Sequence, residues 1–237
     1  MANTQPKWVQ ILKQTLCYLF GLLLIAFGIN LAKLCELGIS PVSSVPRACE
    51  LIWGFSLGTT TIIVYCVLVL LQFIVLRKRF RLVNALGIVV SFLFGFLIDF
   101  LGSDPEAPIH LMASFPHPYN YFMQLLYLAG SIIIIGLGVF LYLLPKWIPM
   151  PAEGLAAAIS QVSGKNFGDC KTFVDCGMIL IALVLQIVYL GGFASFSGTD
   201  IVVREGTILS AVCVGQFAKL LNRLLGERMR RWIGKQE

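Results

Sequence analysis

The chain has 237 residues, of which 58% are hydrophobic and only 13% are charged. A mean hydropathy of +0.86 excludes a soluble domain of this size, which could not bury so much apolar surface in one core. The net charge of +6 does not indicate nucleic-acid binding, because the basic residues flank apolar segments instead of alternating with aromatic residues. Composition therefore predicts an integral membrane protein.

Six apolar segments approach the length of about 20 residues that a helix needs to cross a bilayer. In chain order they cover residues 16–34, 60–76, 82–101, 121–144, 172–192 and 207–221. The first follows Lys7, Trp8 and Lys13 without a small-residue cleavage site, so we interpret it as a retained helix and not as a signal peptide. The sequence predicts an all-α polytopic membrane protein with six transmembrane helices in a single membrane domain, 1–237.

The Lys and Arg residues are distributed unequally between the two sides of this membrane domain. If both termini lie on one side, fifteen of the 18 basic residues lie there too, including a cluster over 77–81 and a basic tail over 223–237. The other side keeps only Lys33, Arg47 and Arg204. Because Lys and Arg concentrate in cytoplasmic segments, we predict that both termini are cytoplasmic.

No pattern in the chain predicts a metal, a cofactor or catalysis. Seven cysteines lie mostly in or beside apolar segments without any CxxC pair, so we interpret them as free buried thiols. His110 and His117 lie in a proline-containing loop over 102–120 and are interpreted as solvated loop residues. HExxH and GxSxG motifs and paired intramembrane carboxylates are absent. We therefore expect no enzyme activity, no cofactor and no nucleic-acid partner.

The second half of the chain repeats features of the first half. An offset of 110 residues pairs Gly28 with Gly138, Pro41 with Pro151, Gly54 with Gly164, Gly58 with Gly168 and Cys66 with Cys176. In the third helix of each unit the offset grows to 119, which pairs Gly87 with Gly206 and Ser91 with Ser210. The units, about 14–103 and 120–226, each hold three spanning helices, so the second enters the membrane from the opposite side. We predict two inverted repeats, an arrangement that places transport sites near the midplane; the alternative is coincidence among 22 glycines.

A short apolar segment follows the first spanning helix of each unit and cannot cross a membrane by itself. In unit one, Ser40 and Pro41 suit the N-cap and first position of a helix, although Pro46 moves the expected regular start to residues 44–45. Gly54 is a suitable C-terminal stop. In unit two, Pro151 begins the corresponding segment, which covers 152–162 and ends at 163–164.

We predict that both short segments are re-entrant half-helices. A helix N-terminus inside the membrane presents unpaired N–H groups and a positive dipole end, which favours an anionic ligand. In unit one, hydroxyl contacts can come from Ser40, Ser43 and Ser44. In unit two, Glu153 can itself satisfy the helix end, which weakens the prediction of an anion there. The alternative is a pair of interfacial amphipathic helices that pack the bundle.

Charged residues beside the fifth apolar segment are further candidates. Asp175 follows Lys171 by four residues, so the two can share a helix face and partly neutralise each other, and Asp169 lies near the same end. Charges at membrane depth cost about 2.5–3.5 kcal/mol and mark functional positions; the alternative is an interfacial ion pair that only anchors the helix. The candidate substrate pathway comprises Ser40, Pro41, Ser43, Ser44, Pro151, Glu153, Asp169, Lys171 and Asp175.

Small residues recur where helices are expected to meet or bend. Close helix packing is the favoured interpretation of this pattern, and a hinge role is the alternative. The positions are Gly54, Gly58, Gly87, Ser91, Gly95, Gly164 and Gly168.

Three features of the sequence are typical of one known family: GINLAKLCELGISP at 28–41, the pair Gly54 and Gly58, and LFGFLID at 93–99. In these features the chain resembles the YczE/YyaS/YitT family of bacterial membrane proteins. Without a soluble C-terminal domain, the chain is more similar to the YczE branch. The resemblance implies a bacterial inner (plasma) membrane protein, and it implies no activity and no site residue because the family has no settled function.

We expect a transporter of a small molecule or ion, with an anion favoured, whose site lies between the two half-helices near the midplane. The alternative is a non-transporting accessory or scaffold protein that assists an export, biosynthetic or envelope complex. The partners expected are the lipid bilayer and an unidentified substrate. A second copy of the chain and a partner ATPase stay open as further partners, since the chain has no P-loop.

Overall fold

The computed structural model describes residues 6–102, 112–189 and 202–234. Its α-helices are α1 (Lys7–Cys35), α2 (Pro41–Trp53), α3 (Leu57–Leu76), α4 (Leu82–Leu101), α5 (Tyr121–Leu143), α6 (Pro151–Ser163), α7 (Phe167–Tyr189) and α8 (Glu205–Trp232). Short 3-10 helices lie at Arg77–Arg79 and Met112–Ser114. Six of the α-helices are long and apolar enough to cross a membrane, and α2 and α6 are short, with 13 residues each. The predicted all-α class with six spanning-length helices is confirmed.

Several helix boundaries differ from the sequence prediction. Helix α1 begins at Lys7 and α8 continues to Trp232, so each extends beyond its apolar segment, and part of the predicted basic tail is helical. Polar residues form helix as readily as apolar ones, so hydropathy does not mark these ends. The regular start expected at 44–45 is wrong, because α2 already begins at Pro41 and contains Pro46. A proline there removes a single backbone donor, which the packing around α2 tolerates.

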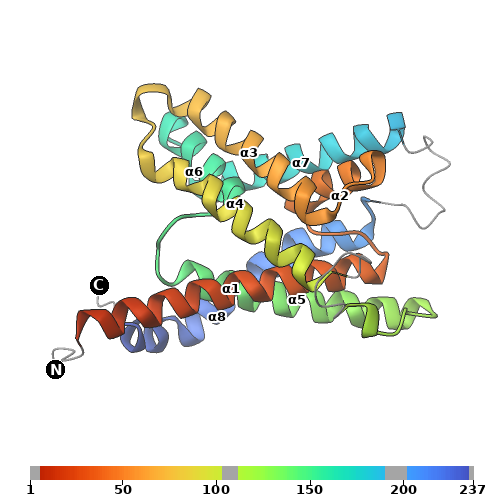
Figure 1. Cartoon of the computed structure of the whole chain (residues 1–237), viewed down its shortest axis with the longest axis horizontal. Helices are drawn as coiled ribbons and strands as arrows, with labels where there is room; N and C mark the ends of the chain where they lie inside the picture. Colours follow the sequence, from red (N-terminus) through yellow and green to blue (C-terminus); the bar gives the residue numbers. More distant parts are fainter. Residues whose placement is uncertain (1–5, 103–111, 190–201, 235–237) are drawn as a thin grey trace.

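Two close helix pairs form the framework of the bundle (Figure 1). Helices α1 and α5 pack along much of their length, and a Cβ added at Gly21 would lie 2.9 Å from the backbone oxygen of Gly138. Helices α3 and α4 pack through Gly58 and Gly95, where a Cβ added at Gly95 would lie 2.6 Å from the Gly58 oxygen. Only glycine permits backbones to approach this closely. In the described residues, α7 and α8 do not form a third pair of this kind.

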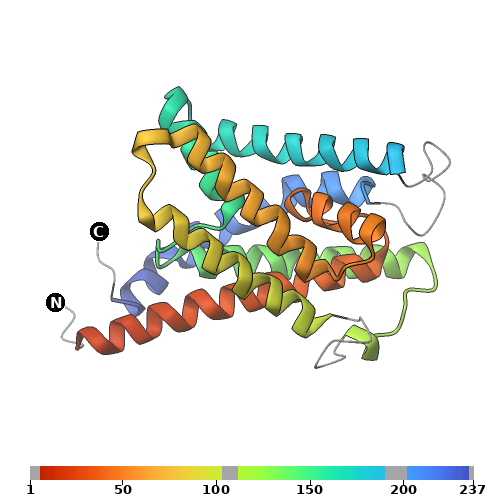
Figure 2. The ribbon, with the colours of Figure 1, turned by 45° about the horizontal axis from the view of Figure 1, so that its top comes forward.

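The two short helices each pack on a long helix of the other half of the chain. Helix α2 packs on α7 and helix α6 packs on α3 (Figures 1 and 2). Ser44 Oγ lies 3.5 Å from the backbone oxygen of Met178, halfway along α7, and Gln72 Nε2 of α3 donates to the oxygen of Pro151 at 2.9 Å. The N-terminal ends of both short helices are thus buried inside the bundle and not on its surface.

A carboxylate from α4 caps the start of α3. Asp99 Oδ1 accepts a hydrogen bond from the backbone N–H of Gly58 at 2.7 Å, and Oδ2 accepts one from Ser56 Oγ at 2.7 Å. These bonds satisfy donors that a helix N-terminus leaves unpaired and place a negative charge at the positive end of its dipole. Together with the Gly58 and Gly95 contact, they fix α3 to α4 near one end of the bundle.

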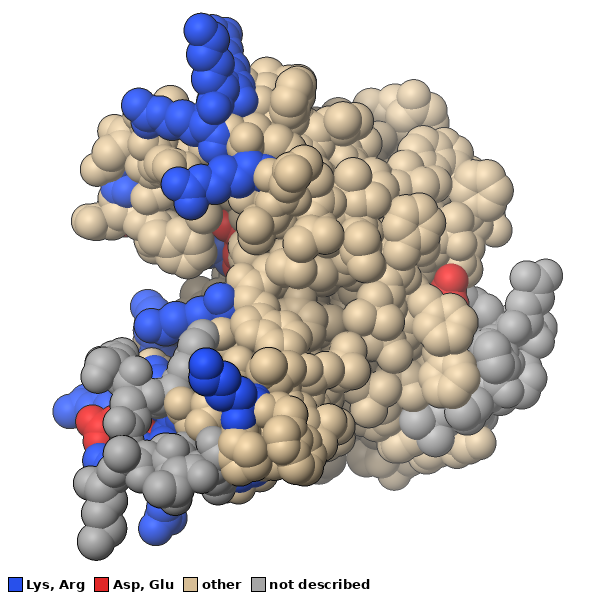
Figure 3. Space-filling model, turned by 60° about the vertical axis from the view of Figure 1, so that its left-hand side comes forward, with Lys and Arg blue, Asp and Glu red and all other residues tan. Residues whose placement is uncertain are grey.

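Both ends of the described chain lie at the opposite end of the bundle (Figure 1). Lys13 Nζ donates to the backbone oxygen of Trp232 at 3.3 Å, and Gln14 Nε2 donates to that of Ile233 at 3.2 Å. The connection from α3 to α4, which carries Arg77, Lys78, Arg79 and Arg81, lies at the same end (Figure 2). We call this the basic end. Figure 3 shows Lys and Arg side chains gathered on it.

Candidate functional site

Lys171 lies between two carboxylates near the start of α7. Its Nζ is 2.6 Å from Asp175 Oδ1 and 4.0 Å from Glu153 Oε1. The spacing of four residues on α7 brings Lys171 and Asp175 to one face, and α6 supplies Glu153 from its first turn. The three side chains are only 25%, 21% and 18% exposed, respectively, for Lys171, Asp175 and Glu153. The structure thus brings together three of the predicted pathway residues.

Two polar atoms beside this cluster are buried without a hydrogen-bond partner in the described residues. They are Glu153 Oε2 and the hydroxyl of Tyr142, a side chain only 2% exposed. Tyr142 and Glu153 are neighbours that interact electrostatically, but their oxygens do not meet with the geometry of a hydrogen bond. A buried polar group without a partner costs about 1–3 kcal/mol, so native proteins retain few of them. Next to an ion pair, such atoms mark a place where water or a ligand can complete the hydrogen bonds.

We expect Tyr142→Phe to leave the free energy of unfolding unchanged or to raise it by about 1 kcal/mol, because the substitution removes a buried hydroxyl without a partner. Tyr18→Phe is the matched control: the Tyr18 hydroxyl donates to the backbone oxygen of Ile148 at 2.9 Å, so its loss should be destabilising. Thermal unfolding of both variants in mild detergent measures the difference. Equal destabilisation by the two substitutions would show that the Tyr142 hydroxyl is satisfied.

The serines at the start of α2 make their shortest hydrogen bonds locally. Ser40 Oγ donates to Ser43 Oγ at 3.0 Å, and Ser44 Oγ donates to the backbone oxygen of Pro41 at 2.6 Å. Ser40 occupies the predicted N-cap position but makes no side-chain cap bond. Helices α2 and α6 share α3 and α7 as neighbours and do not pack closely on each other within the described chain. The predicted pathway residues of α2 are therefore not joined to those of α6.

Asp169, also predicted to line the pathway, lies outside the cluster. It occupies the first turn of α7, where its side chain is exposed, and it forms no ion pair among the described residues. Its negative charge near the helix N-terminus accounts for its position without a binding role.

The predicted packing glycines divide into two groups. Gly58 and Gly95 lie in contact, a Cβ at Gly87 would lie 3.3 Å from Val69, and Ser91 Oγ donates to the Gly87 oxygen at 2.7 Å. By contrast, no described residue lies within 4 Å of a Cβ built at Gly54, Gly164 or Gly168, so the packing interpretation is wrong for these three within the described chain. Gly54 and Gly164 instead adopt φ of +72° and +71° as C-caps of α2 and α6, a conformation that favours glycine.

A cavity of about 460 Å³ lies beside Glu153 and Lys171, between α5, α6, α7 and α8. Its wall is mostly apolar, whereas its basic side chains come from three segments of the chain: Lys146, Lys171, Lys219 and Arg230. Figure 3 shows a hollow at the basic end, with Lys and Arg above and below it and acidic atoms visible inside. The ion-pair cluster therefore borders a space that a ligand can enter.

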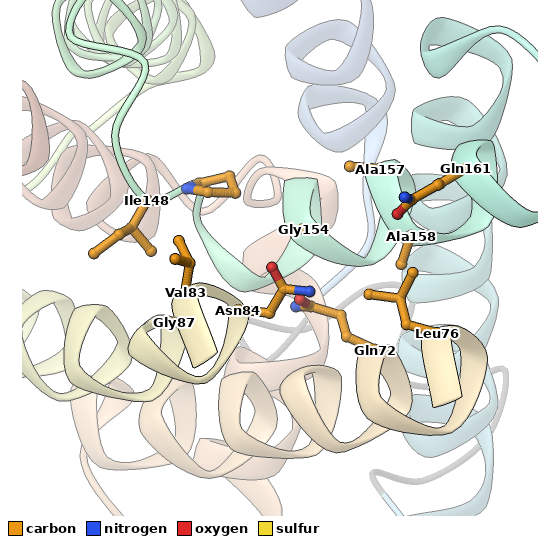
Figure 4. Close-up of a pocket in the computed structure, with 11 residues that line it drawn as sticks. Gln72, Leu76, Val83, Asn84, Gly87, Ile148, Gly154, Ala157, Ala158 and Gln161 are labelled. Carbon is orange, nitrogen blue, oxygen red and sulfur yellow. The ribbon is translucent and has the colours of Figure 1, made fainter. Parts of the chain in front are cut away.

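A second, smaller cavity of about 100 Å³ lies on the other side of α6 (Figure 4). Gln72 of α3 and Asn84 of α4 point into it beneath Gly154, which leaves room for the Gln72 amide: a Cβ at Gly154 would lie 2.8 Å from Gln72 Nε2. Ala157 lines both cavities. The first half of α6 thus separates the two cavities, and its small residues Gly154 and Ala157 line them.

Sequence reasoning missed several residues of this site. Three of them are interpreted from the sequence as topology signals alone: Lys146, Lys219 and Arg230. The spacing of Lys219, Asn222 and Arg230 on a helix does, however, predict that they share one polar face. Tyr142 gave no signal, because an aromatic residue within an apolar segment is indistinguishable from a lipid-facing one.

Comparison with known proteins gives a family and no activity. A family model described as "Family of unknown function (DUF6198)" matches residues 12–223. The chain is also similar to "Uncharacterized protein YyaS" of Bacillus subtilis (strain 168), with 25% identity over 169 residues that cover 71% of this chain and 79% of that protein. No solved structure matches the chain. These matches confirm the resemblance drawn from 28–41 and 93–99.

Proposed function

Since this chain belongs to the DUF6198 family, whose description names no activity, we propose from its site that it is a carrier of a small molecule or ion across the membrane. One observation carries the proposal: Glu153, Lys171 and Asp175 meet at the N-terminus of a buried half-helix, beside a cavity at the basic end. Charged groups at membrane depth are costly, and proteins retain them where they bind or conduct a solute. In a bundle with a purely structural role, such a cluster would cost free energy without a compensating function.

Inverted repeats are part of the proposal, and the helix contacts support them. Adding 110 to Gly21 and Gly28 gives Ser131 and Gly138, and α1 and α5 meet through Gly21 with Gly138 and through Gly28 with Ser131. The same operation exchanges the packing of α2 on α7 with that of α6 on α3. Such reciprocity is expected of two units related by a two-fold axis between α1 and α5.

The packing departs from this symmetry at one place, and the departure suits a carrier. Helices α3 and α4 are closely packed, whereas their counterparts α7 and α8 border the larger cavity. If the two units exchanged these arrangements, that cavity would close and an equivalent one would open at the other end. We propose that the basic end faces the cytoplasm of a bacterial inner membrane, as the charge distribution favours, so that the proposed carrier would be open inward in this arrangement.

Single cysteines, introduced after replacement of the native ones, test the proposal in membrane vesicles of known orientation with a membrane-impermeant maleimide. Ala157→Cys on α6 should react from the basic-end side, and Ser43→Cys on α2 should react from the opposite side in a minor state. Ile133→Cys, on a half-exposed position of α5, should react from neither side because maleimides need water. If Ser43→Cys never reacts while Ala157→Cys does, the chain does not alternate, and an accessory role becomes the better proposal.

A further inference from the structure

The larger cavity contains positive charge that the protein itself does not neutralise. Lys171 is paired with Asp175 and Glu153, but Lys146, Lys219 and Arg230 have no carboxylate partner within the ranges that the structure describes. Among the described residues, Arg230 Nη1 donates to the amide oxygen of Asn222 at 3.2 Å. Three cationic groups without a carboxylate partner in the described residues therefore border one cavity, whose lining includes a single, already paired carboxylate; this makes the cavity electrostatically complementary to an anion.

Helix α8 presents this charge on one face. Lys219, Asn222, Gly226 and Arg230 follow the spacing of successive turns. Gly226 is buried between two of them, since a Cβ there would lie 2.5 Å from Asn222 Oδ1 and 3.2 Å from Arg230 Nη2. Because Gly226 has no side chain, the Arg230 side chain can extend along the helix to Asn222. Arg223 and Arg228, on the same helix, are exposed and do not line the cavity.

The rest of the cavity does not resemble a site for a small inorganic ion. Its volume of about 460 Å³ is several times that of a phosphate group, and its walls are largely apolar: Val139, Phe140, Leu143, Leu144, Phe167 and Ala218. In the described residues α7 and α8 are not closely packed, so no tight helix pair closes the cavity on that side. The positive charge at the rim is complementary to an anionic group, and the apolar walls are complementary to an apolar group of the same ligand.

We infer that this cavity binds an anionic amphiphile, with its phosphate or carboxylate head between Lys219 and Arg230 and its apolar body against α5 and α7. Basic pockets between membrane helices recognise such head groups. The inference rests on the proposed function in one respect only, namely that the bound amphiphile is then the carried substrate.

Equilibrium binding to the purified full-length protein in neutral detergent tests this. The probe is a phosphatidic acid with a fluorescent acyl chain, and K219Q/R230Q should weaken its binding at least about tenfold because two charge-assisted contacts are lost. The control R223Q/R228Q removes the same charge from the same helix and should change binding less than about twofold. Competition by n-octyl phosphate would identify a water-soluble amphiphile as sufficient, and competition only by two-chain phosphatidic acid would identify a membrane lipid.

Three results would overturn the inference. These are equal weakening by the two double variants, equal binding of a fluorescent phosphatidylcholine, and competition by inorganic phosphate as strong as that by octyl phosphate. The binding experiment tests the amphiphile site and the labelling experiment tests the carrier function, so a failure of one can be told from a failure of the other. Selective binding without Ser43→Cys labelling would leave the amphiphile site and remove the carrier function, whereas alternating labelling without selective binding would leave a carrier of another ligand.

Discussion

Replacing Lys171 by methionine is expected to lower the free energy of unfolding by about 2 kcal/mol, because Asp175 and Glu153 then stay largely buried without a cation. Methionine keeps most of the side-chain volume, so lost packing contributes little. Fully buried pairs lose about 3–5 kcal/mol in this way, and the partial exposure of these three side chains reduces the expected effect. Thermal unfolding in mild detergent measures it.

Two further variants separate the ion pair from general effects of the substitution. Lys165→Met removes an exposed lysine close to α7 and should change stability by less than about 0.5 kcal/mol. Adding Glu153→Gln and Asp175→Asn to Lys171→Met should recover much of the loss, because no unpaired charge then remains. If Lys171→Met is as harmless as Lys165→Met, the three groups are hydrated and the cluster does not exist as a buried site.

Gly95→Ala is expected to destabilise the protein by about 2 kcal/mol, although alanine is the better helix former. The added Cβ would lie 2.6 Å from the Gly58 oxygen and would also meet the Ile62 side chain, so α3 and α4 must separate. Gly177→Ala on α7 makes the same substitution where no described residue lies within 4 Å, and it should stabilise by up to about 1 kcal/mol. Unfolding of the two variants should therefore shift in opposite directions; a shift in the same direction would contradict the close α3 and α4 contact.

The spanning helices could be predicted because a bilayer requires about 20 apolar residues from each of them, and few other segments satisfy that. The ends of α1 and α8 could not, because beyond the apolar segments water and lipid head groups solvate polar helix and impose no hydropathy limit. The start of α2 was misjudged because the local preference against helix before Pro46 was outweighed by the packing of α2 on α3 and α7.

The candidate site was predictable only where its residues share one helix. Lys171 and Asp175 follow from their spacing on α7. The approach of Glu153 to Lys171 depends on how α6 packs against α7. The burial of Tyr142 depends on the packing of α5. Hydropathy predicts neither arrangement. Helical phase explains why Asp169 lies outside the cluster: it precedes Lys171 by two residues, so its side chain is on another face of α7.

The Asp99 cap has a thermodynamic consequence for a carrier built in this way. Separation of α3 from α4 would break the two charge-assisted hydrogen bonds of Asp99 and the contact between Gly58 and Gly95. In the described residues, no comparable bonds join α7 to α8. A difference of about 2.7 kcal/mol between two states corresponds to roughly 1% occupancy of the less favoured one. The resting ensemble would then be dominated by one orientation, and a transported molecule must supply enough differential affinity to populate the other.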